Sequence, residues 1–160
     1  MKKILIIILY AFFICNFASC KNNSSNEIIT ESKGDEVMNS LELKIEDSIL
    51  NVTWENNESV NALKELANNE LTISMHKYSN FEQVGSIGYT LPSNDKRIKT
   101  IPGDIVLYSS NQIVIFYGSN TWEYTKLGHI NLEESELKEL LGNNDVTIKI
   151  KALRWTYDWN

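Results

Sequence analysis

The sequence predicts a mainly β protein, a closed antiparallel barrel of seven or eight short strands with two short helices between them. Three observations support this fold class. Apolar and polar residues alternate with a period of two over several short segments, the pattern of half-buried strands. Turn-forming residues separate these segments. An open sheet of so many short strands would leave unpaired edges, so we expect the sheet to close.

The first half of the domain, which we expect to begin at residue 39, contains a hairpin, a helix and a third strand. Residues 41–46 and 50–54 alternate on either side of a polar turn, which predicts a hairpin. Asn56 and Asn57 then offer a cap for a helix over residues 58–67, whose apolar residues fall on one face. Residues 71–76 alternate again and predict the third strand.

The second half contains the strongest strand signals. Residues 105–108 and 112–117 are nearly continuous apolar runs rich in β-branched residues, as in strands buried on both faces. A further strand is predicted over residues 122–130, a helix over residues 133–141 and a last strand over residues 146–152. No internal repeat or second domain is evident.

The last strand changes phase near its end. Its apolar positions are even-numbered up to Ala152 and odd-numbered from Leu153 onward. A slip of one residue moves side chains to the opposite face, so the pattern predicts a β-bulge or bend near these two residues. Trp155, Tyr157 and Trp159 would then share one face of the tail. They either pack on the mouth of the barrel or form an exposed stripe that contacts a partner.

The composition is globular and acidic. The 160 residues are 42% hydrophobic and 22% charged, with a formal net charge of −6. Binding to nucleic acid is driven mainly by Lys and Arg, so this charge argues against a nucleic-acid partner. The two cysteines, Cys15 and Cys20, both lie in the first twenty residues. No disulfide is therefore expected in the domain.

Residues 1–19 have the features of a signal peptide. Lys2 and Lys3 precede a nearly unbroken apolar stretch that is too short for a membrane span. Small residues, Ala18 and Ser19, then precede Cys20, which resembles a bacterial lipoprotein signal whose cysteine is lipidated. A secreted protein with a chance cysteine and an uncleaved anchor are the alternatives.

Residues 20–38 are polar and lack hydrophobic periodicity, so we expect a flexible tether from lipidated Cys20 to a barrel domain over residues 39–160. The protein would then be extracytoplasmic, held in the cell envelope by its lipid anchor.

Several segments resemble the small bacterial cyclophilin-like domain family. The resemblance lies in residues 103–108 (GDIVLY), 112–118 (QIVIFYG) and 124–130 (YTKLGHI), with the helix near residue 58 and a Leu91-Pro92 turn in the expected order. It covers about residues 41–152 and implies a closed, eight-stranded antiparallel β-barrel with helices near its ends.

Activity does not follow from this fold. Cyclophilins that isomerise X–Pro bonds share a Phe-His-Arg segment, a Pro-Gly-Phe run and a Gln-Gly-Gly turn, and this chain has none of them. Their arginine donates to the proline nitrogen and so lowers the barrier to rotation, which is about 18–20 kcal/mol. Only Arg97 and Arg154 are present here. Arg97 falls in a predicted polar loop, where it either overhangs a groove or is simply solvated, and we assign no catalytic residue.

Aromatic residues are the remaining functional signal. Large aromatic side chains with polar tips supply contact area at low entropic cost, which suits a peptide or ligand groove. They equally suit the packing of a barrel core or rim. The candidate groove residues, taken with Arg97 and drawn from an aromatic cluster that also contains Tyr89, are Phe81, Arg97, Phe116, Tyr117, Trp122 and Tyr124.

The sequence lacks the residue patterns typical of metal binding, hydrolysis and nucleotide binding. His76 and His129 are the only histidines and no cysteine lies in the domain, so neither a metal site nor a cofactor is predicted. The sequence also lacks a Gly-x-Ser-x-Gly elbow, a phosphate-binding glycine loop and a His-Glu-x-x-His motif.

Three hypotheses follow. The first is a lipid-anchored binding module for a peptide, protein or small ligand without strong isomerase activity. The second is a divergent peptidyl-prolyl cis-trans isomerase that aids the folding of exported proteins. The third is a structural envelope lipoprotein that docks a partner through Trp155, Tyr157 and Trp159.

Overall fold

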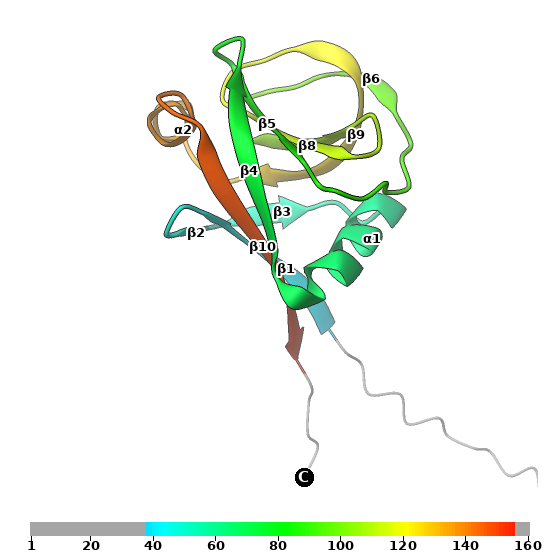
Figure 1. The fold of residues 1–160 in the computed structure, drawn as a ribbon. Coiled ribbons are helices and arrows are strands. Elements are labelled where there is room, and N and C mark those ends of the chain that lie inside the picture. The colour runs from blue at the N-terminus through cyan, green and yellow to red at the C-terminus, as the bar shows by residue number, and fades with distance from the viewer. Residues whose placement is uncertain (1–37, 156–160) are drawn as a thin grey trace, which may run out of the picture. The chain divides into compact units, whose positions relative to one another are not determined.

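The computed structural model describes residues 38–155. The predicted signal peptide, residues 20–37 of the predicted tether, Tyr157 and Trp159 lie outside these residues, as does the side chain of Trp155. Met38, the last residue of the predicted tether, belongs to the first strand. The described part contains ten strands, two α-helices and a short 3₁₀ helix, η1 (Figure 1). In chain order, the α-helices and strands are β1 (Met38–Ile45), β2 (Ser48–Leu50), β3 (Val52–Trp54), α1 (Glu58–Leu66), β4 (Leu71–Tyr78), β5 (Glu82–Ser86), β6 (Lys96–Lys99), β7 (Asp104–Tyr108), β8 (Gln112–Phe116), β9 (Thr121–Ile130), α2 (Glu134–Leu141) and β10 (Val146–Trp155).

The strands form a nearly closed antiparallel barrel. Nine of them follow the order β2-β1-β10-β4-β5-β8-β7-β9-β3, and β6 pairs with β9 outside this path. The two ends of the path, β2 and β3, are separated in the chain by Asn51 alone. The predicted mainly β antiparallel barrel is thus confirmed.

Two details of that prediction need correction, since the barrel is nearly closed rather than closed and has ten strands within residues 38–155 rather than eight. One reason is that the predicted strand over residues 50–54 divides at Asn51. Its first part, in β2, pairs with β1, and its second part, β3, pairs with β9. The other reason is that two strands lie outside the predicted ranges: β5, which has no alternation of apolar and polar residues, and β6, a polar segment that contains Arg97 and has the pattern of a loop.

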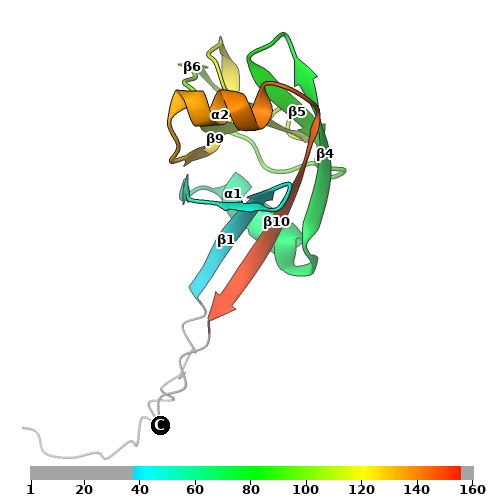
Figure 2. The ribbon, with the colours of Figure 1, turned by 90° about the vertical axis from the view of Figure 1, so that its left-hand side faces the viewer.

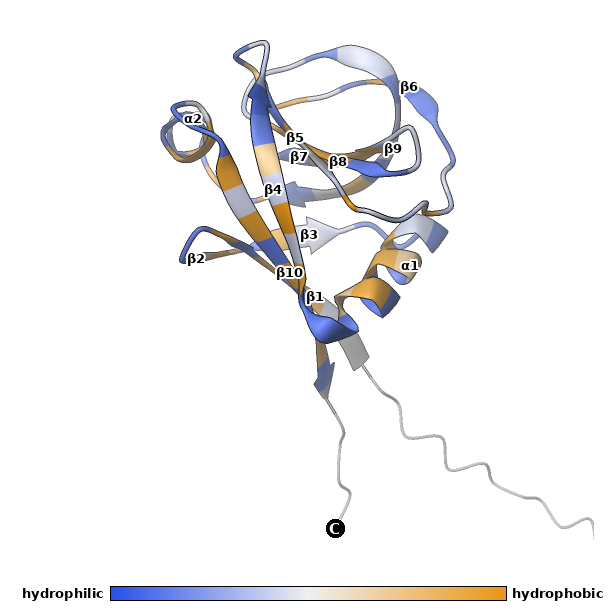
Figure 3. Cartoon of the chain, viewed as in Figure 1, coloured by the Kyte–Doolittle hydropathy of each residue, from blue (hydrophilic) through white to orange (hydrophobic). Residues whose placement is uncertain are grey.

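The main core fills the barrel, and both helices contribute to it. Alternate residues of the strands point inward, as the alternation of hydropathy along β10 illustrates (Figure 3). Helices α1 and α2 lie on opposite sides of the barrel (Figures 1 and 2). Val60 and Leu63 of α1, and Leu137 and Leu141 of α2, are fully buried in the same core. The helices thus cover apolar strand faces that would otherwise meet water.

The start of α1 is fixed by a side-chain cap. The Asn57 side-chain oxygen accepts a hydrogen bond from the backbone N–H of Val60 at 2.9 Å, as the sequence predicts. The helix ends at Leu66 and passes into η1 (Ala67–Asn69). A capping box between Glu133 and Glu136 opens α2.

The C-terminal strand contains no bulge. β10 pairs with β1 in unbroken register from Ile45↔Ile148 to Met38↔Trp155, a long ribbon in Figure 2. The predicted bulge near Ala152 and Leu153 is therefore wrong. The side chains of Ala152 and Leu153 are both half-buried, although they point to opposite faces of the strand. The alternation of apolar residues therefore does not define the strand register at this end of β10. The register shift lies instead between Ile105 and Val106, where β7 meets β9.

A second hydrophobic cluster lies on the other face of strands β5, β8, β7 and β9. Val106, Val114, Phe116 and Tyr124 form its buried part, separate from the main core. Successive side chains of a strand point to opposite faces. In each of these strands, one set of alternating side chains therefore packs in the main core, and the other set lies on this second face. The candidate site lies on this second face.

Candidate functional site

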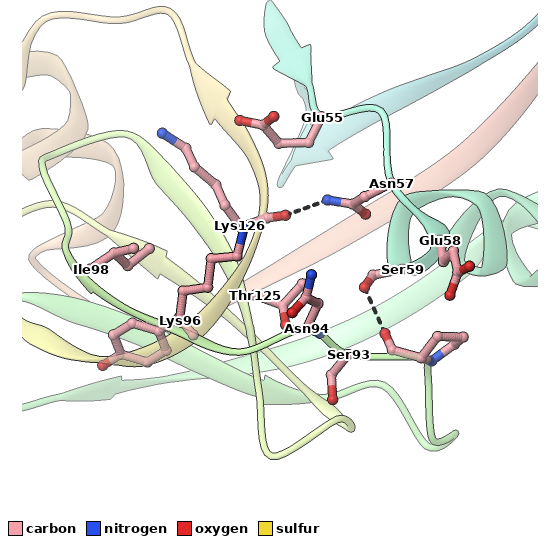
Figure 4. A pocket seen from close by; sticks show the side chains of 12 residues that line it. Glu55, Asn57, Glu58, Ser59, Ser93, Asn94, Lys96, Ile98, Thr125 and Lys126 are labelled. Carbon is pink, nitrogen blue, oxygen red and sulfur yellow. Dashed lines mark hydrogen bonds between the residues drawn. The ribbon is translucent and has the colours of Figure 1, made fainter.

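Two hollows share the side chain of Tyr124. The polar pocket has a volume of about 560 Å³. The aromatic pocket has a volume of about 400 Å³. The polar pocket is lined by Glu55, Asn57, Glu58, Ser59, Pro92, Ser93, Asn94, Lys96, Ile98, Tyr124, Thr125 and Lys126 (Figure 4). The aromatic pocket is lined by Tyr78, Glu82, Val84, Tyr108, Gln112, Val114, Asn120, Trp122 and Tyr124.

The polar pocket uses many of its polar groups to hold the fold together. The Asn57 amide donates to the backbone carbonyl of Lys126 at 2.9 Å, and the Ser59 hydroxyl donates to the carbonyl of Pro92 at 2.6 Å (Figure 4). Thr125 donates its hydroxyl to Asp95 at 2.6 Å. These bonds join α1 and the loop before β6 to β9. The pattern is that of a structural junction, in which the side chains of Asn57, Ser59 and Thr125 already have partners.

The aromatic pocket is built on the second face of the sheet. Val84 of β5 lies opposite Val114 of β8, and Tyr108 of β7 lies opposite Gln112 of β8. Residues opposite each other in an antiparallel pair share a face, so the register alone places these side chains together. The adjoining strand β9 adds Trp122 and Tyr124 to the lining.

Exposed aromatic side chains gather at this pocket. Tyr78 is 61% exposed, Trp122 is 52% exposed and Tyr108 is 36% exposed. They are three of the six large hydrophobic residues exposed within residues 40–154, and all three line the same hollow. Tyr124 lies beneath them, with its ring edge-on to Tyr108 at 6.0 Å between centroids. A hollow with exposed aromatic residues around it is the usual form of a ligand site.

A buried acid completes the pocket. Glu82 is only 7% exposed, and its Oε2 atom has no hydrogen-bond partner in the described protein. Burial raises the pKa of Glu82 to about 7, so the carboxyl changes its charge near neutral pH. Burial and the nearby Glu82 charge also raise the pKa values of Tyr117 and Tyr124. A titratable group of this kind in a hollow marks a candidate functional residue.

The structure brings some of the sequence-predicted groove residues together and separates others. Trp122 and Tyr124 line the aromatic pocket. Phe116 is fully buried against Tyr124, with 5.7 Å between ring centroids, and Phe81 stacks on Phe116 at 6.3 Å. These two rings support the pocket from behind. Tyr117 belongs instead to the main core.

Arg97 lies apart from both hollows. It is exposed on β6, where it pairs in register with Glu123 of β9. Its strand neighbours Lys96 and Ile98 line the polar pocket, whereas Arg97 lines neither. Alternation along β6 explains this difference.

The sequence alone does not predict three of the residues that line the aromatic pocket, namely Glu82, Tyr78 and Tyr108. Tyr108 stands at the end of a clear strand on the same face as Val106, so its position was available from the alternation. Glu82 gave no comparable signal, because a single acid between Phe81 and Gln83 looks like an ordinary surface residue. Its burial depends on strand pairings distant in sequence.

Both histidines are paired with acids. His129 Nδ1 lies 2.9 Å from Asp104 Oδ1, which Lys126 also approaches at 3.0 Å. His76 Nδ1 lies 3.0 Å from Asp145. Within residues 38–155, no group of three or more His, Cys, Asp or Glu side chains is placed to hold a metal ion. In the same range, no helix is both long and apolar enough to span a membrane.

Three comparisons with known proteins bear on the family to which this chain belongs. A search of curated proteins found no match. A solved structure described as "Structure of McbB in complex with tryptophan" is similar, with a TM-score of 0.49 and 9% identity, over 70% of this chain and 44% of that one. The family model described as "Cyclophilin-like family" matches residues 43–151, which is most of the chain and nearly the whole barrel. The chain therefore belongs to the cyclophilin-like family.

Proposed function

We propose that this cyclophilin-like domain is a binding module whose aromatic pocket holds a peptide segment or a small organic ligand. The observation that carries the proposal is the combination, in one hollow, of three exposed aromatic side chains and a buried carboxyl with an unpartnered oxygen. Exposed aromatic residues cost solvation free energy unless a ligand covers them, and the carboxyl oxygen lacks a donor.

The proposed location is the extracytoplasmic side of a bacterial membrane. The support is the leader, in which a positive start and an apolar stretch are followed by small residues and Cys20. Lipid attached to this cysteine would hold the domain at the cell envelope, with residues 20–38 as the tether.

A binding role is favoured over proline isomerisation by the positions of the arginines. Arg97 is exposed and lines neither hollow, and Arg154 donates to Asn68 at 3.1 Å. We expect no strong acceleration of cis-trans exchange in a standard X–Pro peptide. Robust turnover that Arg97→Ala abolishes would establish the isomerase alternative instead.

A library of short peptides and small organic molecules tests the proposed site. In two-dimensional amide NMR spectra of the protein, ligands should shift the signals of β5, β8 and the start of β9. Trp122→Ala should weaken each such ligand by about tenfold, because it removes an aromatic wall of the pocket.

Tyr89→Ala is the matched control for Trp122→Ala. Tyr89 is also an exposed aromatic residue, at 59%, but it lines neither hollow. Ligands that bind Tyr89→Ala and wild type equally support the site. If ligands shift only the signals of residues in the polar pocket, the binding site is the polar pocket and the proposed site in the aromatic pocket is wrong.

A further inference from the structure

The aromatic pocket carries charge of one sign. Among the nine residues that line it, Glu82 is the only acid, and none is Lys, Arg or His. A carboxylate or phosphate ligand would therefore meet a carboxyl group with no cation of the pocket to offset the repulsion. The protein as a whole is also acidic, with a net charge of −6. These charges favour a cationic ligand over an anionic one.

The buried oxygen of Glu82 requires a hydrogen-bond donor. Oε2 is enclosed and has no partner in the described protein, and leaving a buried acceptor unpaired is costly. The amide of Asn120, another lining residue, already donates to the Tyr124 hydroxyl at 3.0 Å. A ligand with an N–H group at Glu82 would form a charge-assisted hydrogen bond, the stronger kind.

The remaining lining residues suit the rest of such a ligand. The faces of Tyr and Trp rings attract organic cations, and Tyr78, Tyr108 and Trp122 present partly exposed rings at the pocket. Val84 and Val114 add apolar surface next to Glu82 and can contact a methylene chain. Acid, aromatic rings and apolar surface together match an ammonium group on an aliphatic stem.

Resting on the proposed function, we infer that the pocket recognises a primary or secondary ammonium group on an aliphatic stem. The Glu82 carboxylate pairs with the N–H groups, and the rings of Tyr78, Tyr108 and Trp122 surround the cation. A free alkylamine and the side chain of a lysine in a peptide both carry this chemistry, and the experiment distinguishes these two sources.

Three probes of equal length, hexylamine, hexanol and hexanoate, test the charge preference by calorimetric or NMR titration of the full protein at pH 8. Hexylamine should bind about tenfold more tightly than hexanol, and hexanoate should bind least. A blocked tripeptide Gly-Lys-Gly, compared with its norleucine counterpart, tests the peptide source. Binding of hexylamine alone identifies a small amine, and preferential binding of the lysine peptide identifies a peptide ligand.

Glu82→Gln tests the proposed partner, because it removes the charge and keeps the shape. The variant should lose the preference for hexylamine but still bind hexanol, which would also show that its pocket is folded. Glu123→Gln is the matched control, since Glu123 is an exposed acid between Trp122 and Tyr124 that does not line the pocket. It should bind hexylamine as wild type does.

Acidification provides a second readout. Burial raises the pKa of Glu82 to about 7, so protonation should weaken hexylamine binding by about tenfold from pH 8 to pH 6. The other titratable groups around the carboxyl are Tyr78, Tyr108, Tyr117 and Tyr124. The raised pKa values of Tyr117 and Tyr124 keep both neutral over this range.

The possible failures are distinguishable. Equal binding of hexylamine and hexanol at the pocket overturns the ammonium inference and leaves the proposed ligand pocket supported. Retained amine preference in Glu82→Gln also overturns the inference, because the assigned partner is then unnecessary. If Glu82→Gln does not fold, the comparison of the three hexyl probes on wild-type protein still decides. Failure of every amine together with failure of the library screen overturns the inference and the proposed function.

Discussion

Glu82 is a charged residue type at a buried position of the barrel. A carboxyl group that is 7% exposed and has an unpartnered oxygen reduces the stability of the fold. Its neighbours are apolar, since Val84 lies two residues further along β5 and Phe116 lies opposite it on β8. A leucine or glutamine at this position would avoid the cost of burying a charge. Functional sites commonly retain groups that weaken the fold, and Glu82 fits that pattern.

Glu82→Gln should stabilise the protein in a pH-dependent way. The folded pKa of about 7 exceeds the ordinary value of 4.5, so the folded state binds more protons between these values and wild-type stability falls as pH rises through them. The variant lacks this loss. Its free energy of unfolding in urea, relative to wild type, should rise by about 2 kcal/mol from pH 5 to pH 8, after allowance for partial solvation.

Groups common to wild type and variant cancel in this comparison, so it isolates Glu82. If the free energy of unfolding of Glu82→Gln relative to wild type were the same at pH 5 and at pH 8, this result would contradict the raised pKa of Glu82. Glu123→Gln, at an exposed position of β9, should show little change at either pH.

Among the elements, those with strong local patterns were the ones predicted from the sequence. β7, β8 and α1 were placed nearly to the residue, because apolar runs and an asparagine cap are local signals. β5 was not predicted, since its Glu-Gln-Val-Gly-Ser sequence has no alternation of apolar and polar residues. β6 is polar and is held as a strand by pairing with β9, a tertiary contact.

The residues of the candidate site also divide into those that the sequence predicts and those that depend on strand pairing. Trp122 and Tyr124 are candidates from the sequence because they belong to a cluster of large aromatic residues near loops and strand ends. Glu82 and Tyr78 come from two strands joined by a turn and reach the pocket only through pairing of β5 with β8 and β4. The placement of Tyr117 in the core required knowledge of the phase of β8. Residue type thus indicates candidates, and sheet register decides which of them meet.

The junction between α1 and β9 provides a test at this scale. Asn57→Ala removes the helix cap to Val60 and the hydrogen bond to the Lys126 carbonyl. We expect a loss of about 1–2 kcal/mol in the free energy of unfolding, measured by urea denaturation. Asn61→Ala, at an exposed position within the same helix, is the control and should change stability by less than about 0.5 kcal/mol. Equal effects of the two variants would contradict the assigned cap.

At the scale of the whole molecule, the barrel has two hydrophobic faces and a proposed membrane anchor. The main core and the second hydrophobic cluster lie on opposite faces of the same strands. The barrel can therefore hold its shape through the core while the other face stays open to a ligand. Rigid elements with an accessible hollow suit a preformed binding site.

The anchor is tested by Cys20→Ser. In fractionated cells, this variant should move from the membrane fraction to the soluble fraction, because it lacks the thiol that would carry the lipid. Cys15→Ser, within the apolar stretch of the leader, is the matched control and should remain with the membrane. Unchanged membrane association of Cys20→Ser would refute lipidation at this residue.

The most direct test of the binding role is a crystal structure of the protein with the tightest ligand from the library or the amine series. We expect the ligand to occupy the hollow between Tyr78, Tyr108 and Trp122, with a polar atom within hydrogen-bond distance of the Glu82 carboxyl. A ligand seated in the polar pocket beside α1, or elsewhere on the barrel with the aromatic pocket empty, would contradict it.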